Sequence, residues 1–548
     1  TAREVVRSST VFTTHTPVPA GHDLFDEELI ASYFGNMVAE MGIDFRALKD
    51  LAWDGERQKF NMTLLALRHS FMSNGVSRLH GKVAREMFRP CYSRLHPEEI
   101  PVTSVTNGVH VETWLAAELK ELFSRYLGKR WFEQIAQPEM WAGVDDIPDQ
   151  ELWRVRRLLK EKMILFARTS LKQQRRRNRE PLQHIIEVDD YLDPDILTIG
   201  FARRFATYKR ACLLFSNLAR LEQLVNNSER PVRLVFAGKA HPADSAGQDL
   251  IKKIYDFSMR PELRGKVLLL ENYDIHMARH LVQGVDIWLN TPRRPMEASG
   301  TSGIKAAVNG LINVSTLDGW WPEAYNGSNG FAVGSESAYE DDEIQDRDDC
   351  YSLYSVLEEK VVPMYYRKTE GFSPEWVRLM KETIKSVAPV FNTGRMVAEY
   401  TERFYIPAIK RGKNFTDNNN YLAGHASNFK KLILDYWDQV SFVSVESSGR
   451  PKMNAGETIE LNAVLSLGLI YTRSVAVEMV YGEVVEGGLK NITVLPMTLE
   501  SEIAENIYRY TGRLTMPQGA FGYTVRVRPD SRDFPYQELP LITWAPVF

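Results

Sequence analysis

The stretch that decides the fold is PMEASGTSGIKA, residues 295–306. It lies between two apolar runs, residues 285–289 and 311–314, which predict buried strands. We therefore expect a strand-to-helix turn where small residues let a ligand approach the backbone and the free N–H groups of a helix start attract anions. The turn ends in a single lysine, Lys305, which either carries chemistry or lies solvated on the surface. The turn alone does not decide between these two interpretations.

Outward from this turn, the chain alternates between apolar strands and helices. Near-continuous apolar strands separated by helices are typical of a parallel, doubly wound sheet, so we predict an α/β fold. The predicted strands are residues 196–201, 231–238, 267–271, 285–289 and 311–315, and the predicted helices are residues 209–224, 249–259 and 275–282. Ligands bind such sheets at the carboxyl ends of the strands. The polar residues expected to converge there are Arg203, Arg204, Gly238, Lys239, Asn272, Tyr273, Asn290, Thr291, Asp318 and Gly319.

The flanking segments differ from this pattern. The further predicted strands are residues 10–13 and 101–105, and the further predicted helices are residues 61–80, 114–127, 149–170, 373–405 and 414–436. After residue 440, runs such as 474–481 and 523–528 alternate apolar and polar residues, which indicates an antiparallel β-sandwich over residues 441–548. This part carries no catalytic constellation. Its expected roles are packing, oligomer contact or carbohydrate contact, in that order.

Length and composition bound the class of protein. A chain of 548 residues predicts two or three domains, and its 44% hydrophobic and 25% charged residues are typical of a globular protein. With a net charge of -4, nothing indicates nucleic acid or a membrane as a partner, and the basic run at residues 173–180 favours a solvated helix face. Cys91, Cys212 and Cys350 lie far apart without metal-ligand spacing. We therefore expect no disulfide, no metal site and a reducing compartment, the cytoplasm.

A basic cluster, RRFATYKR at residues 203–210, follows the first predicted strand of the sheet. Its charges belong to Arg203, Arg204, Lys209 and Arg210. Like charges at the positive end of a helix repel one another unless an anion sits among them, so the pattern favours a phosphate site. Exposed cations paired with scattered acids are the alternative.

Two further features point to a ligand. Glu297 and Lys305 are eight residues apart, and glycosyltransferases that use nucleotide sugars often carry a second glutamate at this spacing to hold the ribose. A lysine at that place argues against a nucleotide sugar, and a buried lysine in a polar cleft is a candidate for a Schiff base. His15 lies in a Pro- and Gly-containing loop after a predicted strand, where a ligand cleft and a structural turn are equally compatible with it.

Several motifs in register resemble the α-glucan phosphorylases, the family of glycogen, starch and maltodextrin phosphorylases. EASGTSGIK, residues 297–305, is similar to the family's pyridoxal phosphate attachment signature, and RRFATYKR is similar to its basic segment. Further family segments match in the same order: TTHTP (13–17), NMTLLALRHSFMSNGVSRLH (61–80), VTNGVHVETW (105–114), FAGKAHP (236–242) and LENY (270–273). The resemblance runs from about residue 11 to residue 405.

The resemblance implies roles for individual residues. Lys305 would attach pyridoxal 5'-phosphate covalently, Lys209 would contact the cofactor phosphate, and Arg204 would bind the substrate phosphate. The remaining cofactor residues would be Thr301 and Ser302 at the phosphate and Trp114 and Tyr273 on its flanks. The remaining substrate residues would be Arg203, which stands where many relatives have lysine, and Tyr208, Glu297, Ser299, Gly300, His15 and Asn107 around the sugar.

The resemblance also implies an architecture and a reaction. Residues 1–110 would be the remainder of an N-terminal Rossmann-like domain, residues 111–440 the C-terminal Rossmann-like catalytic domain, and residues 441–548 the β-sandwich. Together they would form a two-domain glycosyltransferase-B-type fold with an incomplete N-terminal half. The reaction would be reversible, retaining phosphorolysis of a terminal glucosyl unit of an α-1,4-glucan by inorganic phosphate, giving α-D-glucose 1-phosphate. A homo-oligomer is expected.

One family feature has no counterpart in this sequence. The family carries a glycine-rich loop over the phosphates, upstream of the segment that matches His15, so we expect this chain alone to be weakly active or inactive. Two other interpretations stay open: a glycogen-synthase-like nucleotide-sugar glycosyltransferase, and a non-catalytic glucan-binding protein. Lys305 counts against the first, and Glu297, Lys305 and the basic cluster together count against the second.

Overall fold

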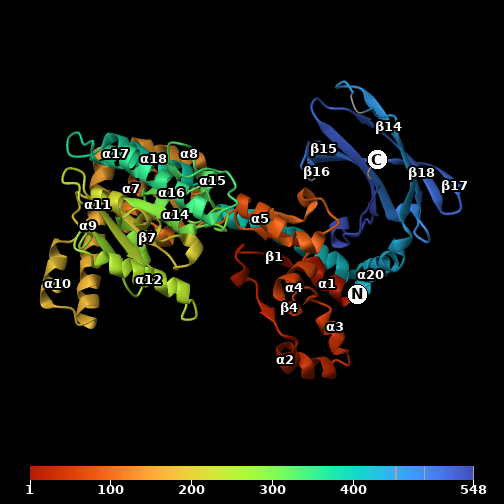
Figure 1. Ribbon diagram of the computed structural model, residues 1–548, viewed down its shortest axis with the longest axis horizontal. Coiled ribbons are helices and arrows are strands. Elements are labelled where there is room, and N and C mark those ends of the chain that lie inside the picture. The colour runs from red at the N-terminus through yellow and green to blue at the C-terminus, as the bar shows by residue number, and fades with distance from the viewer. Residues whose placement is uncertain (451–452, 487, 547–548) are drawn as a thin grey trace.

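Apolar runs of the sequence form a central six-stranded sheet in the computed structural model, which describes residues 1–450, 453–486 and 488–546 (Figure 1). All neighbouring strands are parallel, in the order β12-β11-β10-β7-β8-β9. The strands are β7 (Leu197–Ala202), β8 (Val232–Ala237), β9 (Val267–Leu270), β10 (Ile287–Asn290), β11 (Ile312–Thr316) and β12 (Gly330–Val333). The prediction of an α/β fold with a parallel sheet is confirmed.

Helices cover both faces of this sheet, which is why its strands are apolar on both sides. Ile199 and Ile287 pack into the core cluster on one face, and Val235 and Trp288 pack into the cluster on the other. The surrounding helices are α6 (Val111–Trp114), α7 (Ala117–Tyr126), α8 (Pro138–Trp141), α9 (Asp149–Arg177), α10 (Leu182–Ile186), α11 (Leu218–Val225), α12 (Ser245–Ser258), α13 (Ile275–Gly284), α14 (Thr301–Ala307), α15 (Trp321–Ala324), α16 (Asp342–Val356), α17 (Val362–Tyr366) and α18 (Pro374–Val387). The next helix, α19 (Thr393–Tyr400), packs instead on the N-terminal part, where Tyr400 shares a core cluster with Val105.

The N-terminal part carries a second, three-stranded parallel sheet in the order β1-β5-β6 and a small antiparallel sheet in the order β2-β4-β3. Its strands are β1 (Val11–Thr13), β2 (Leu24–Phe25), β3 (Trp53–Asp54), β4 (Lys59–Asn61), β5 (Met72–Gly75) and β6 (Val102–Ser104), and its helices are α1 (Ala2–Ser9), α2 (Glu27–Glu40), α3 (Phe45–Lys49), α4 (Met62–Arg68) and α5 (Arg78–Phe88). The helical pattern predicted over residues 61–80 has a break at Asn74 and Gly75, and the structure shows that this break is the strand β5 between α4 and α5. Asn74, fully buried in β5, donates a hydrogen bond to the Tyr400 hydroxyl (2.9 Å), so contacts distant in sequence decide this strand.

Two predictions differ from the structure. The helix expected over residues 209–224 begins only at Leu218, where the Asn217 side chain accepts a hydrogen bond from the N–H of Arg220 and caps it. Arg210 has a left-handed backbone (φ +48°), which ends the preceding turn. The basic run at residues 173–180 ends α9, yet Arg175 in it is buried and its guanidinium lies 5.1 Å from the centre of the Tyr191 ring. A wholly solvated face is therefore wrong for this run.

The C-terminal part consists of two four-stranded antiparallel sheets, in the orders β13-β14-β18-β17 and β16-β15-β19-β20. Both sheets contribute to one core, which contains Ile459 and Leu514 from the first sheet and Met479 and Val525 from the second. The elements are α20 (Ile406–Tyr436), β13 (Ser441–Ser447), β14 (Thr458–Ser466), β15 (Val475–Val485), β16 (Gly488–Pro496), β17 (Thr498–Ala504), β18 (Ile507–Thr515), β19 (Phe521–Pro529) and β20 (Thr543–Trp544).

The N-terminal part and the C-terminal sheets lie together at one end of the molecule, with the six-stranded sheet at the other (Figure 1). α20 packs on α1, and Lys430 of α20 pairs with Glu4 of α1 at 2.6 Å. The chain crosses between the two ends at two adjacent places, since Val109 pairs with Asn392 in a short parallel bridge. Within the described ranges, no helix combines the length and the hydropathy that crossing a membrane requires.

Candidate functional site

The turn at residues 295–306 connects β10 to α14, as the sequence predicts. Gly300 caps the helix with a left-handed backbone (φ +82°), which favours glycine. The turn is held from the neighbouring strand end. The Glu297 N–H donates to Asp318 (2.8 Å), and the Trp320 N–H donates to the carbonyl oxygen of Ser299 (2.8 Å). These contacts fix the backbone on which the predicted site residues stand.

Glu297 lies between two of the predicted cations. One of its oxygens, Oε2, lies 2.6 Å from an Arg203 guanidinium nitrogen and 3.0 Å from Lys209 Nζ, and all three side chains are buried. Burial would raise the pKa of Glu297, but the two positive charges outweigh it and hold that pKa below its ordinary value. Burial and the neighbouring charge of Arg203 lower the pKa of Lys209 to about 8. The structure thus brings together three predicted residues from two strand ends.

Positive charge remains at this cluster after the internal pairing. Arg203 Nε and its second terminal nitrogen, as well as Ser299 Oγ, are buried and have no hydrogen-bond partner among the residues described. Arg204 is exposed beside them, and its charge acts on Tyr208 and Lys209. Burial raises the pKa of Tyr208 to about 12, so its hydroxyl stays protonated and can donate a hydrogen bond. Unpaired donors beside an excess of cations are the chemistry of an anion site.

Arg210 does not belong to this anion site, contrary to the prediction that four cations share it. Its buried guanidinium donates to Asp349 (2.7 Å), to Asp346 (2.9 Å) and to the carbonyl oxygens of Thr291 and Pro292 (2.8 and 3.0 Å). Two carboxylates therefore neutralise its charge. Its bonds instead fasten the segment that leads from β10 toward Glu297.

Lys305 lies on α14, half-buried, with its Nζ 3.8 Å from the centre of the Trp114 ring. Burial alone lowers its pKa from the ordinary value. Trp114 and Tyr273 pack against the same buried cluster on one face of the sheet. Burial raises the pKa of Tyr273, and the positive charge of Arg203 opposes this shift.

Thr301 and Ser302 open the helix that carries Lys305. Thr301 is half-exposed at its first position, where the N–H groups of a helix start have no partner within the helix. Ser302 Oγ accepts a hydrogen bond from the indole of Trp288 (3.2 Å). The N-terminus of α14 therefore presents hydroxyl and N–H groups on the same turn as Ser299 and Gly300.

His15 and Asn107 lie in the N-terminal part, and no hydrogen bond or ion pair joins either side chain to the cations within the described ranges. His15 is exposed, and the Asn107 N–H donates to the carbonyl oxygen of Val76 (3.1 Å). Asn107 lies between Thr106 and Val109, where the two ends meet. There Glu323 accepts hydrogen bonds from the N–H of Arg78 (2.7 Å) and from the Thr106 hydroxyl (2.7 Å).

Asp318 is a residue to which the sequence assigned no role beyond its place at a strand end. It is 2% exposed and accepts the N–H groups of Glu297 and Gly319, both at 2.8 Å. Burial raises its pKa to about 7. The two N–H groups favour the carboxylate and lower the pKa, but burial outweighs them. The sequence feature that could have predicted this contact with the backbone is the position of Asp318, after an apolar strand and directly before a glycine.

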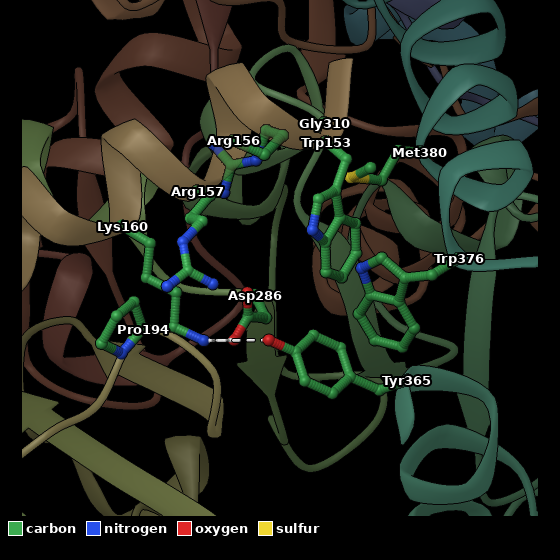
Figure 2. A pocket seen from close by; sticks show the side chains of 10 residues that line it. All are labelled: Trp153, Arg156, Arg157, Lys160, Pro194, Asp286, Gly310, Tyr365, Trp376 and Met380. Atoms are coloured by element: carbon green, nitrogen blue, oxygen red, sulfur yellow. Dashed lines mark hydrogen bonds and ion pairs between the residues drawn. The ribbon is translucent and has the colours of Figure 1, made fainter. Parts of the chain in front are cut away.

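A second cluster of buried charges lies at the amino ends of β7 and β10, and Figure 2 shows its side chains. Lys160 Nζ donates to Asp286 (2.5 Å) and to the Tyr365 hydroxyl (3.1 Å), next to a cavity of about 20 Å³. Asp286 also accepts the N–H of Thr198 (2.8 Å), so these charges are paired, and the cluster fastens the start of two strands. Across the described part of the chain, no three His, Cys, Asp or Glu side chains lie close enough together to hold a metal ion.

Comparisons with known proteins place this site in context. Residues 27–324 match the Phosphorylase family, "Carbohydrate phosphorylase", and residues 437–546 match "Glycogen phosphorylase C-terminal domain". The maltodextrin phosphorylase of Thermococcus litoralis is 40% identical over 100% of this chain and 64% of its own length. The glycogen phosphorylases of Mycobacterium bovis and Aquifex aeolicus are 35% and 39% identical, over 96% and 75% of this chain and 62% and 59% of their own lengths. The chain therefore spans less than two thirds of these relatives.

Proposed function

The chain belongs to the carbohydrate phosphorylase family, and from this we propose that it acts in the phosphorolysis of α-1,4-glucans. The reaction is the reversible, retaining transfer of a terminal glucosyl unit of glycogen, starch or maltodextrin to inorganic phosphate, which gives α-D-glucose 1-phosphate. The observation that carries the proposal is the anion site itself. Unpaired, buried donors of Arg203 lie beside Lys209, and a half-buried Lys305 stands on the adjoining helix.

The residues present fit pyridoxal 5'-phosphate. Lys305 offers an amine whose pKa is lowered, beneath the flat indole of Trp114, and the start of α14 offers N–H and hydroxyl groups for a phosphate. In the proposed assignment Lys305 holds the group covalently, Thr301 and Ser302 bind its phosphate, Lys209 contacts that phosphate, and Trp114 and Tyr273 flank the ring. When bound, the cofactor supplies a phosphate that exchanges a proton with the substrate phosphate.

The charges of the site suit a second phosphate. Arg203, Arg204 and Lys209 are opposed by the single carboxylate of Glu297, so two positive charges are left for the cofactor phosphate and the substrate phosphate together. The exposed Arg204 would bind the substrate phosphate, and Arg203 would do so through its free N–H groups. Holding two phosphates close together against their repulsion is catalysis by positioning and electrostatics.

The sugar would lie between the two ends of the molecule. In the proposed assignment Glu297, Ser299 and Gly300 bind its hydroxyls from the turn, Tyr208 lies near sugar and phosphate, and His15 and Asn107 line the pocket from the N-terminal part. The junction at Glu323, which both ends share, supports this placement. Glu297 would then exchange part of its pairing with the cations for the sugar when phosphate arrives.

The finer architecture is also part of the proposal. The division is residues 1–110 and 111–440 as two Rossmann-like domains of a glycosyltransferase-B-type fold and residues 441–548 as a β-sandwich. The two parallel sheets and the core shared by the two antiparallel sheets support it. We further propose a homo-oligomer, which light scattering on the purified chain tests, and a cytoplasmic location, which the free thiols of the three cysteines suit.

The deciding experiment concerns the cofactor lysine. The purified chain is incubated with pyridoxal phosphate, reduced with borohydride and mapped by peptide mass spectrometry. We expect a pyridoxyl adduct on Lys305 and its loss in Lys305→Ala. The exposed Lys252 on α12 serves as the control, since Lys252→Ala should keep the adduct. A chain that forms no adduct at Lys305 and binds a nucleotide sugar instead would contradict the proposal and favour a glycogen-synthase-like enzyme.

A further inference from the structure

We propose that Asn309 is a positioning residue that fixes the indole of Trp114 over the amine of Lys305. Asn309 follows α14 and is 0% exposed. Its side-chain amide is fully used: Nδ2 donates to the carbonyl oxygens of Lys305 (2.8 Å) and Trp114 (3.0 Å), and Oδ1 accepts the N–H of Ala116 (2.9 Å). One side chain therefore ties the helix that carries the lysine to the segment that carries the tryptophan. The inference rests on the proposed function, because it concerns the proposed cofactor lysine.

The segment that Asn309 holds is a joint between two helices. Trp114 is the last residue of the four-residue helix α6, and α7 begins at Ala117. The last carbonyls of a helix have no partner within it. The carbonyl of Trp114 receives its two donors from elsewhere, namely Asn309 and the side chain of Gln283 on α13 (3.0 Å). The direction in which this short helix points its indole thus depends on two amide side chains.

The position of the indole matters because burial determines the protonation state of the Lys305 amine. No ion pair involves Lys305 in the described part of the chain, and burial is the cause of its lowered pKa. The Trp114 ring lies 3.8 Å from Nζ and excludes water from that side of the amine. The face of the ring also attracts the ammonium, but the pKa is lowered, so desolvation outweighs this attraction. An indole that is free to swing away would admit water, raise the pKa of the amine toward its ordinary value and leave less of the neutral, nucleophilic form.

The test measures the reactivity of Lys305 rather than turnover. Labelling by pyridoxal phosphate with borohydride reduction is followed at stepwise pH in the chain freed of cofactor, with the Lys305 peptide quantified by mass spectrometry. Asn309→Ala should move the midpoint of labelling to higher pH. A shift of about one pH unit makes labelling near neutral pH about tenfold slower. An unchanged midpoint in a folded Asn309→Ala chain overturns the proposal.

A double-mutant cycle separates positioning from general loosening. If Asn309 acts through Trp114, then Asn309→Ala should produce no further shift in a Trp114→Leu background. An equal shift in both backgrounds overturns the proposal, since it would show that Asn309 acts independently of the indole. The proposed function fails in a different way, because the unaltered chain would then show no labelling of Lys305 at all.

A second variant covers the case in which Asn309→Ala does not fold. Gln283→Leu removes the other donor to the Trp114 carbonyl and leaves Asn309 in place. We expect a shift in the same direction but smaller, together with a circular dichroism spectrum like that of the unaltered chain. A folded Gln283→Leu chain with the midpoint of the unaltered chain overturns the proposal when Asn309→Ala cannot be measured.

Discussion

Lys209 couples the charge of the proposed phosphate site to pH. Its amine is protonated below its pKa of about 8 and loses the proton as the pH rises through that value. A charged contact to an anion is worth about 1.5–3 kcal/mol. We therefore expect the affinity of the chain for the phosphate dianion, measured by titration calorimetry, to weaken by about fivefold to tenfold between about pH 7 and pH 9, because the protonated fraction of the amine falls by no more than about tenfold.

The matched variant is Lys209→Arg. A guanidinium stays protonated over this range, so its phosphate affinity should depend much less on pH, although the changed geometry lowers it at every pH. Parallel affinity curves for the two proteins would show that the charge of Lys209 does not act on the bound phosphate. The ionic strength is kept the same at every pH, because screening by salt weakens the charged contacts in the site.

The roles of single residues could be predicted from the sequence where charged residues follow the end of a predicted strand. Arg203, Lys209 and Glu297 could be named from the sequence, and the structure brings them into contact. The sequence could not show that Arg210 has a different role from the other three cations, because its carboxylate partners lie on α16, more than a hundred residues further along the chain. The role of Asp318 could not be predicted for a similar reason. It accepts a hydrogen bond from the N–H of Glu297, and residue spacing in the sequence does not predict such a contact.

At the scale of elements, the two turns at the carboxyl edge of the sheet depend on each other. Gly319 has a left-handed backbone (φ +59°), and a Cβ there would lie 2.3 Å from the carbonyl oxygen of Ser299. Gly319→Ala therefore adds a clash to the backbone strain, and we expect a loss of about 3 kcal/mol or more in the free energy of unfolding. Urea denaturation measures it, and a weakened phosphate affinity should accompany it because the clash displaces the turn that carries Glu297.

Gly371 provides the control for that substitution. Its backbone is also left-handed (φ +88°), but a Cβ there would meet nothing within 4 Å. Gly371→Ala should cost about 1–2 kcal/mol, the strain alone, and leave the site unchanged. Equal losses for the two variants would mean that the contact between the two turns contributes nothing.

Elements were predictable in the central sheet and less so elsewhere. Each strand there is apolar over most of its length, because both faces are covered, and the five strands predicted from apolar runs all form. The strand β5 contains Ser73, Asn74 and Gly75, which read as a break in a helix. These residues have low strand propensity, and the strand is stabilised instead by its pairing with β1 and β6.

At the scale of the whole molecule, buried ion clusters join the N-terminal part to the C-terminal sheets. One cluster pairs Lys430 with Glu4 and Glu538 at 2.6 and 2.8 Å, and a second places Arg526 between Glu99 and Glu478. The sequence predicted the period-two strands but not these contacts, because Glu4 and Lys430 are 426 residues apart and Glu99 and Arg526 are 427 residues apart. The packing of α20 on α1 escaped prediction for the same reason.

Arg526 tests this junction. It is 1% exposed and pairs with Glu99 at 2.6 Å and with Glu478 at 2.8 Å. Arg526→Met leaves the Glu99 carboxylate without its cation, while Glu478 keeps its pair with Arg528. We therefore expect a loss of about 3–5 kcal/mol in urea denaturation and faster proteolytic release of the C-terminal sheets. Arg513→Met removes an exposed pair with Glu460 on the same sheets and should cost about 0–1 kcal/mol. An Arg526→Met chain as stable as Arg513→Met would show that the junction is held by apolar packing instead.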